Sequence, residues 1–371
     1  MKIETIAIHA GNHTDENTKA VIQPITTSTT FTREADGSFP AGYIYSRSGN
    51  PNRTSLENLL AKLENGVDAA AFSSGNAAGM SVFQSLKPGS HIICPDDMYH
   101  GLRSQIKNLF TETMEFDFID VNDEDVLQGH LKPNTELIWL ETPSNPLLKI
   151  TDIRKIAGIA KPRHIKVAVD NTFATPICQQ PLLLGADLVM HSATKYFGGH
   201  SDLMGGALIT SERNEWWAKI RQIQEMGGAI PSPMDCYYLA RSIKTLPYRV
   251  KGHVHNAQIL AEYLQQHPKV ESVMYPGLLS HTQYYIAKNQ MQYFGGMLSF
   301  CVKGGTDEAR KVINRLRLFT QATSLGGVES LIEHRASVEG PDTKTPHNLL
   351  RVSVGLEHID DLIEDIEQAL T

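Results

Sequence analysis

Two short stretches, each an apolar run followed at once by polar residues, decide the fold of this chain. Residues 167–172 have the sequence Val-Ala-Val-Asp-Asn-Thr, and residues 188–195 have the sequence Leu-Val-Met-His-Ser-Ala-Thr-Lys. Short apolar runs of this kind are typical of buried strands in a parallel sheet. Ligands bind at the carboxyl ends of such strands. The two stretches therefore predict two strands of one sheet, with a ligand site where they end.

The same pattern recurs on both sides of these stretches. Helix-length segments separate seven apolar runs, which predicts a mostly parallel, seven-stranded sheet flanked by helices and hence an α/β fold. The runs are Ala69–Phe72, Ile92–Cys94, Phe116–Val121, Leu137–Leu140, Val167–Val169, Leu188–Met190 and Ala207–Ile209.

The first part of the chain predicts an irregular arm and then a helix. Residues up to Gly49 are rich in Thr and Ser, and glycines and prolines break any regular period. In the helix that follows, Thr54 and Glu57 are expected to form a capping box, and leucines recur on one face. We therefore expect an N-terminal arm over residues 1–49 and a large α/β domain over residues 50–230.

The pattern changes after residue 227. The segment Gly227–Pro233 is rich in Gly and Pro, as hinges and loops are. Helical periodicity dominates beyond it, with strands expected at Met297–Val302 and near Leu350–Val354. We expect residues 231–371 to form a smaller α+β domain.

Composition limits the classes of partner. The chain has 371 residues and a formal net charge of −7 without a basic run, which argues against nucleic acid or an anionic membrane as partner. No apolar run is long enough to span a bilayer. The four cysteines are scattered, so we expect neither disulfides nor a metal site. The opening Met1–Glu4 lacks signal-peptide character, and we expect a cytoplasmic protein.

Lys195 is the first candidate for chemistry. A lone lysine is most often a surface charge. Lys195, however, follows a predicted strand beside the hydroxyls of Ser192 and Thr194, which suit phosphate oxygens, and comes 25 residues after Asp170. Lysine forms Schiff bases with aldehyde cofactors, and an aspartate can keep a pyridine nitrogen protonated. These residues therefore favour a pyridine-aldehyde cofactor.

A second candidate site is the run Ser74-Gly75-Asn76, where a predicted strand turns into a helix. Free backbone N–H groups at such a helix start bind phosphate, although glycine there is more often only a turn. Neither Gly-x-Gly-x-x-Gly after a strand nor a Walker A loop occurs in the chain. Nicotinamide and nucleoside-triphosphate chemistry therefore has no motif support.

Long motifs over almost the whole chain resemble those of the pyridoxal-phosphate (PLP) enzymes of cysteine and methionine metabolism. That family includes cystathionine γ-lyase, cystathionine γ-synthase and methionine γ-lyase. The resemblance implies pyridoxal 5′-phosphate as cofactor and the PLP-dependent transferase fold of the aspartate-aminotransferase type (fold type I). The motifs are Tyr45–Pro51, Glu141–Pro146, Val169–Thr172, Ser192–Tyr196, His200–Asp202, Ser324–Gly327 and Arg351–Glu357.

The resemblance also implies a reaction class. We expect trans-sulfuration by γ-elimination or γ-replacement on small amino-acid substrates, either sulfur amino acids or activated homoserine. Within this chemistry, methionine γ-lyase activity, O-acylhomoserine sulfhydrylase activity and β-elimination from cystathionine or cysteine stay open. A non-catalytic PLP-binding protein is the alternative from a different class.

Roles for cofactor-binding residues come with the resemblance. It implies that Lys195 holds the cofactor and moves protons, that Asp170 pairs with the ring nitrogen, and that Tyr99 stacks on the ring and acts as acid or base. Tyr45 and Arg47 would reach the phosphate of a neighbouring subunit, which implies a dimer with shared sites, usually within a tetramer. The residues implied to bind the phosphate within one subunit are Gly75, Asn76, Ser192 and Thr194.

Substrate binding falls to three further residues. The resemblance implies that Arg351 clamps the substrate carboxylate with its guanidinium fork. Asn145 and Ser324 would help to orient cofactor and substrate. All three lie in the motifs that carry the resemblance.

Some positions depart from the family pattern. Ile44 and Thr323 stand where cystathionine-specialised members carry glutamates for the distal ammonium, and His100 follows Tyr99 where a glycine is usual. We therefore expect a substrate without a distal ammonium, such as methionine, homocysteine or an activated homoserine ester. His334 and Arg335 also depart from the pattern. Arg335 would meet an anionic acyl or phosphoryl group, or else Arg335 and His334 form surface or structural hydrogen bonds.

Overall fold

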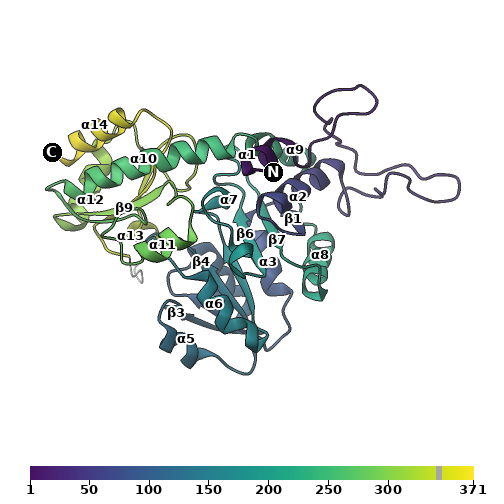
Figure 1. Ribbon diagram of the computed structural model, residues 1–371, viewed down its shortest axis with the longest axis horizontal. Coiled ribbons are helices and arrows are strands. Elements are labelled where there is room, and N and C mark those ends of the chain that lie inside the picture. Colours follow the sequence, from purple (N-terminus) through teal and green to yellow (C-terminus); the bar gives the residue numbers. More distant parts are fainter. Residues whose placement is uncertain (340–344) are drawn as a thin grey trace.

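The computed structural model describes residues 1–339 and 345–371. A large domain built on a central sheet occupies the middle of the molecule in Figure 1. A smaller domain that carries the C-terminus lies at one end of the long axis, and an extended N-terminal arm lies at the other end.

Seven strands form the sheet of the large domain, in the order β1-β7-β6-β5-β4-β2-β3. Strand β7 runs antiparallel to β1 and β6, and the remaining pairs are parallel, which confirms the mostly parallel sheet. The strands are β1 (Asp68–Phe72), β2 (His91–Pro95), β3 (Glu115–Ile119), β4 (Thr135–Glu141), β5 (Lys166–Asp170), β6 (Leu188–Ser192) and β7 (Gly206–Thr210).

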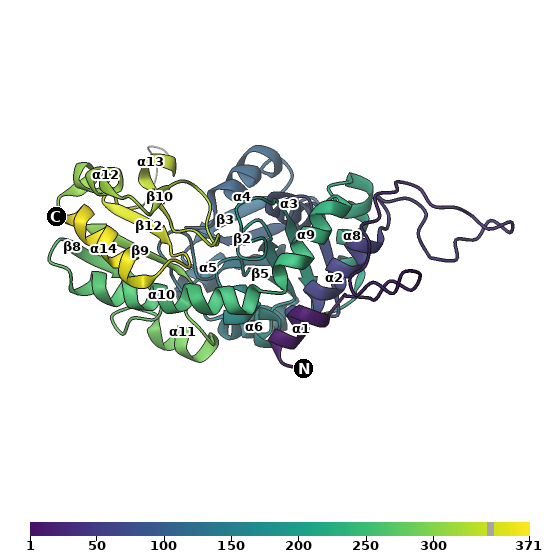
Figure 2. The same cartoon turned by 90° about the horizontal axis from the view of Figure 1, so that it is seen from above.

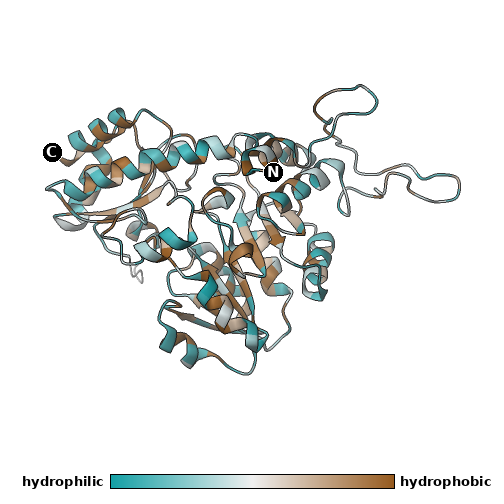
Figure 3. Cartoon of the chain, viewed as in Figure 1, coloured by the Kyte–Doolittle hydropathy of each residue, from teal (hydrophilic) through white to brown (hydrophobic). Residues whose placement is uncertain are grey.

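Helices cover both faces of this sheet, so its inner strands are mostly apolar along their length, whereas the sequence of the edge strand β3 alternates between polar and apolar residues. One face packs on α3, α4, η1 and α8, and the other on α2, α5, α6 and α7. Figure 3 shows the apolar residues gathered along the strands. The helices and helical turns are α2 (Pro51–Leu63), α3 (Gly75–Gln84), α4 (His100–Gln105), η1 (Ile106–Phe110), α5 (Glu124–His130), α6 (Ile153–Ala160), η2 (Lys161–Arg163), α7 (Thr175–Cys178), η3 (Pro181–Leu184) and α8 (Glu215–Gly227).

The start of α2 differs from the expected capping box. The helix begins at Pro51, and the side chain of Asn50 accepts the N–H groups of Asn52 and Arg53. Proline at the first helical position needs no hydrogen-bond acceptor, so the helix starts earlier than Thr54. Glu57 instead accepts the N–H of Ala71 at 2.9 Å and so ties α2 to β1.

The small domain has its own sheet, in the order β10-β11-β12-β9-β8. Its core draws residues from the region between Ala257 and Leu370. Helices α12 and α14 contribute their apolar faces to this core. Both strands expected from the sequence are present, with β12 one residue earlier. The elements are α9 (Pro233–Ile243), α10 (Leu246–Gln266), β8 (Val270–Met274), α11 (Tyr284–Gln290), β9 (Met297–Val302), α12 (Gly305–Arg315), β10 (Thr320–Gln321), β11 (Leu331–His334), α13 (Ala336–Glu339), β12 (Leu349–Ser353) and α14 (Ile359–Leu370).

The long helix α10 joins the two domains (Figures 1 and 2). The preceding helix α9 and the first half of α10 bury Cys236, Leu239 and Val250 in the same core as α2. The first half of α10 thus packs in the core of the large domain and its second half in the core of the small domain. The sequence pattern predicted a division at residue 231. Amphipathic helices give no sign of which of two cores they will join.

The sequence predicted an irregular arm over residues 1–49, but the first part of this segment is helical. Ile3–His9 forms helix α1, which buries Ala7 in the core shared with α2 and α10. The irregular arm proper runs from Gly11 to Gly49 and extends away from the body (Figures 1 and 2). A short period-free helix of seven residues has too little amphipathic pattern to be recognised from sequence.

Within the described ranges, no helix combines the length and apolar character needed to cross a bilayer.

Candidate active site

Asp170 and Thr172 form the centre of the site, at the carboxyl end of β5. The Asp170 carboxylate is buried and accepts the N–H of Thr172 at 3.0 Å. The Thr172 hydroxyl accepts the N–H of Ser192 at 2.8 Å, which ties the ends of β5 and β6 together. Burial raises the pKa of Asp170, and the bonds from Thr172 act against this rise. A cation placed beside Asp170 would stabilise its charged form.

Lys195 lies three residues beyond the end of β6. Its Nζ donates to Ser324 Oγ at 2.8 Å, across the boundary between the domains. Burial first, and then the nearby charge of Arg351, lower the pKa of Lys195 to about 8. Ser324 has a φ of +85°, a strained conformation for serine that aims its hydroxyl at the lysine. The amine is therefore far closer to neutrality at physiological pH than a surface lysine.

Arg351 in β12 joins the predicted substrate-binding residues. Its Nη1 donates to Asn145 Oδ1 at 3.1 Å and its Nη2 to the carbonyl oxygen of Ser324 at 3.0 Å. Burial, followed by the charge of Arg335, lowers the pKa of Arg351 to about 10, so it stays a cation at neutral pH. The fold thus brings Asn145, Ser324 and Arg351 together from three distant parts of the chain.

The predicted phosphate residues lie at the start of α3 and beyond β6. Ser74 caps α3 and accepts the N–H of Ala77, so the N–H groups of Gly75 and Asn76 point out of the first turn without helical partners. A Cβ on Gly75 would lie 2.9 Å from Ser192 Cβ, so only glycine lets α3 start this close to β6. This turn and the Ser192 side chain form an anion cradle.

Thr194 has a partner within the chain. Its Oγ1 donates to the carbonyl of Gly205 at 3.3 Å and accepts the N–H of Gly205 at 3.1 Å. Thr194 therefore fixes the loop beyond β6, and one lone pair of its hydroxyl is left for a phosphate oxygen.

Tyr99 stands before α4, with 41% of its surface exposed. Its backbone N–H donates to Glu141 Oε2 at 2.7 Å. The ring lies over Gly101, where a Cβ would be 2.4 Å from Tyr99 Cε1. The ring therefore requires a glycine at position 101, whereas position 100 can be a histidine. Burial raises the pKa of Tyr99, and the charges of Arg335 and Arg351 oppose the rise. The phenol is protonated at neutral pH.

Tyr45 and Arg47 are not brought to this site by their own chain. Both are exposed and lie on the arm, at the end of the molecule opposite the small domain (Figures 1 and 2). Arg53 in α2 donates to the carbonyls of Ser46 and Arg47 at 2.8 and 3.0 Å, which anchors the base of the arm. Their action in a neighbouring subunit stays a prediction.

Glu333 was not among the site residues predicted from the sequence, yet it forms an ion pair that holds Arg335 in place. Glu333 Oε2 lies 2.9 Å from Arg351 Nη2 and 2.9 Å from Arg335 Nη1. Arg335 also donates to Glu339 through Nε and Nη2. Of the two roles considered for Arg335, the contacts support the structural one. The i, i+2 spacing of Glu333 and Arg335 at the end of a strand was the available signal.

His334 is likewise held by structural bonds. Its Nε2 contacts the carbonyl of His347 at 2.6 Å and its Nδ1 contacts Ser337 Oγ at 2.6 Å. A carbonyl only accepts, so Nε2 carries the proton and Nδ1 accepts from the Ser337 hydroxyl.

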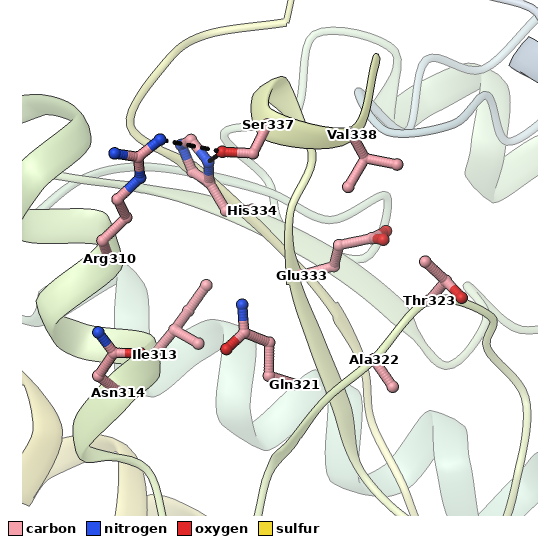
Figure 4. Close-up of a pocket in the computed structure, with 10 residues that line it drawn as sticks. All are labelled: Arg310, Ile313, Asn314, Gln321, Ala322, Thr323, Glu333, His334, Ser337 and Val338. Atoms are coloured by element: carbon pink, nitrogen blue, oxygen red, sulfur yellow. Dashed lines mark hydrogen bonds between the residues drawn. The ribbon is translucent and has the colours of Figure 1, made fainter. Parts of the chain in front are cut away.

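A cavity of about 420 Å³ lies beside the clamp, between α12, β10, β11 and α13. Figure 4 shows Arg310, His334 and Ser337 linked along one side and the Glu333 carboxylate extending toward Thr323 on the other. Glu333 thus lines the cavity and also forms an ion pair with Arg351. The lining residues are Arg310, Ile313, Asn314, Gln321, Ala322, Thr323, Glu333, His334, Ser337 and Val338.

Comparison with known proteins identifies the family to which this site belongs. The family model described as "Cys/Met metabolism PLP-dependent enzyme" matches residues 4–371. The chain belongs to this family. The enzyme therefore uses PLP, and the cofactor expected from the sequence is confirmed.

Relatives of the enzyme span several reactions of one chemistry. Cystathionine gamma-synthase of Mycobacterium tuberculosis (strain ATCC 25618 / H37Rv) is 47% identical over 99% of this chain and 96% of its own. Cystathionine beta-lyase of Coxiella burnetii is 44% identical over 99% and 97%. The crystal structure of metB from Corynebacterium glutamicum superposes with a TM-score of 0.97 at 42% identity, covering 100% and 98%. The enzyme is a PLP-dependent trans-sulfuration enzyme with the fold of this family.

The residues present fit PLP on three structural grounds. Lys195 offers a buried amine of lowered pKa, which suits bond formation with an aldehyde. Asp170 and Glu141 are adjacent buried carboxyls, and a protonated ring nitrogen would offset their repulsion. The first turn of α3 offers N–H groups to a phosphate.

Proposed function

We propose that the enzyme acts at Cγ of a homoserine-derived amino acid, where it replaces or removes the attached group in the manner of a cystathionine γ-synthase or γ-lyase. The observation that carries this proposal is the meeting of Lys195 and Arg351 on Ser324: the lysine donates to its hydroxyl and the arginine to its carbonyl. Because Lys195 and Arg351 contact the same residue, a substrate whose carboxylate binds Arg351 would have its neighbouring carbons close to the amine of Lys195.

Bound PLP supplies the electron sink that makes the hydrogens on Cα and then Cβ acidic. In our proposal, Lys195 holds the cofactor and moves these protons, for which a pKa of about 8 is well matched to neutral pH. Asp170 would pair with the ring nitrogen. Gly75, Asn76, Ser192 and Thr194 would hold the phosphate, together with Tyr45 and Arg47 of a neighbouring subunit.

Arg351 binds the substrate carboxylate in this proposal. The guanidinium charge attracts a carboxylate, and Asn145 and Ser324 fix the plane of this guanidinium. Glu333 fixes the same guanidinium from the small domain. The clamp is thus rigid before substrate arrives.

Tyr99 is the proposed acid for the departing group. Burial raises the pKa of its phenol, so the proton is present at neutral pH. A thiolate or carboxylate that leaves Cγ would accept this proton or a hydrogen bond from the phenol.

The cavity beside the clamp would receive the group attached to Cγ. Its acidic residue, Glu333, is neutralised by two guanidinium groups. Arg310 has a single long contact of 3.5 Å, to Ser337, and forms no ion pair with any described residue. Among the described residues, the cavity therefore offers a positive charge without an ion-pair partner. This favours a γ-substituent that is neutral or anionic, such as an acyl or phosphoryl ester, over one that ends in an ammonium.

We also place the enzyme in the cytoplasm as a homo-oligomer, at least a dimer that shares its sites. The support for shared sites is that the side chains of Tyr45 and Arg47 are exposed at the base of the arm.

A substrate panel tests the proposal. Thiol and 2-oxo acid release would be measured with methionine, homocysteine, cysteine, cystathionine and acylated homoserines, each with and without added cysteine. We expect acylated homoserines with a terminal carboxylate to give the highest kcat/KM.

Arg310→Ala should lower that kcat/KM about fivefold, in line with one exposed ion pair. Arg315→Ala, on the same helix outside the cavity, is the matched control.

Two outcomes would contradict the proposal. Release of 2-oxobutanoate from cystathionine alone would overturn the preference for substrates without a distal ammonium. Pyruvate and homocysteine from cystathionine would instead establish β-elimination, the activity named for the Coxiella burnetii relative.

A further inference from the structure

Glu141 is a buried carboxyl at the end of β4 to which the proposed chemistry gives no task. It is 5% exposed and pairs with Asp170 in the parallel register of β4 and β5. Burial raises the pKa of Glu141 well above its usual range, and the charge of Asp170 adds to the rise. Keeping a carboxyl here is costly unless hydrogen bonds offset the cost.

The partners of Glu141 are backbone groups of two site residues. Its Oε2 accepts the N–H of Tyr99 at 2.7 Å, and the N–H of Asn145 also stabilises its charged form. Asn145 in turn accepts from Arg351 through its side chain. One carboxyl thus contacts the segments that carry the phenol and the substrate clamp, beside the carboxyl that is proposed to face the ring nitrogen.

We propose that Glu141 is a positioning residue, which holds the backbones of Tyr99 and Asn145 in fixed relation to Asp170. The inference rests on the proposed function, because it assumes the roles given there to these three residues. A carboxylate suits the task since it has two acceptor oxygens for two N–H groups. Glutamine would offer one acceptor and turn an amide donor toward the second N–H. Aspartate is one methylene shorter and would not reach both.

The test compares Glu141→Gln with Asp365→Asn in the holoenzyme. Asp365 is a matched control: it is also 5% exposed, and it accepts the N–H groups of Arg317, Leu318 and Phe319 in the small domain. Both variants should lower the melting temperature. Only Glu141→Gln should weaken PLP binding, by about tenfold in Kd for one lost buried hydrogen bond. It should also change the visible circular dichroism of bound PLP, which reports the orientation of the ring.

Glu141→Asp keeps the charge and serves if the glutamine variant fails to fold. It should show the same weaker PLP binding and altered circular dichroism. Wild-type Kd and circular dichroism in whichever of the two variants folds would overturn the inference. Failure of the wild-type protein to bind PLP at Lys195 would instead overturn the proposed function, so the two failures are distinguishable.

Discussion

At the scale of single residues, the surroundings of Lys195 make it different from the other lysines. Its amine is buried, donates to Ser324 Oγ and lies near the guanidinium of Arg351. Burial disfavours the charged form first, and the arginine charge adds to this. Only a neutral amine attacks an aldehyde, so the site keeps this lysine reactive at a pH where surface lysines are fully protonated.

The pH dependence of PLP capture follows from this pKa. Because the folded pKa is about 8, below the ordinary value of 10.5, the neutral fraction of Lys195 rises up to pH 8 and then levels off. We expect the capture rate to rise about tenfold per pH unit below pH 8 and to be flat above it. Stopped-flow absorbance after mixing apoprotein with PLP from pH 6 to 10 measures this. A midpoint near 10 would contradict the burial argument, and Lys195→Ala should give no bound chromophore.

At the scale of elements, the junction of β6 with α3 determines how the phosphate would be bound. Helix α3 starts with N–H groups that have no helical acceptor, and its macrodipole favours an anion at that end. Gly75 allows the close approach, since any Cβ there would meet Ser192 at 2.9 Å. The anion cradle thus depends on the packing of two elements rather than on a single side chain.

Gly75→Ala tests this junction. We expect the added methyl to push α3 away from Ser192 and to raise the Kd for PLP about tenfold, the loss of roughly one hydrogen bond. Gly158→Ala in α6 is the matched control, because its Cβ meets nothing within 4 Å. The control should leave PLP binding unchanged and stabilise the protein by about 0.5–1 kcal/mol. Equal Kd values in both variants would show that the close approach has no part in phosphate binding.

At the scale of the whole molecule, the active site is formed by both domains. Lys195 and Asn145 come from the large domain, and they contact Ser324 and Arg351 of the small domain. The arm projects from the far end of the large domain (Figure 1). In our proposal, Tyr45 and Arg47 act in the site of a second subunit.

Subunit mixing tests the shared site. Lys195→Ala has an intact arm, and a Tyr45→Phe/Arg47→Ala variant has an intact lysine. In a mixed dimer, one site combines the intact lysine with the intact arm, so random mixing should restore about a quarter of the wild-type sites. Activity and retained PLP after co-expression of the two variants measure this. Activity no higher than that of the arm variant alone would rule out sharing.

The sequence predicted features that depend on local pattern. All seven strands of the large sheet lie where apolar runs predicted them. The inner strands are apolar along their length because they are buried on both faces, whereas the edge strand β3 alternates polar and apolar residues. Asp170 and Lys195 became candidates because they lie at or shortly after the ends of such runs. Local pattern failed at α1, which is short, and at α2, where Asn50 and Pro51 provided a stronger start than Thr54.

The amino-acid sequence by itself determined the sheet and the family and singled out Lys195 as the lysine proposed to react, since each depends on residue order over short distances. Only the tertiary structure decided that Glu333 pairs with Arg335 and that the buried carboxyl of Glu141 accepts the N–H of Tyr99. It also decided where the two cores divide along α10. These features depend on burial and on contacts between residues far apart in the chain, which determine whether a charge is paired and what its pKa becomes.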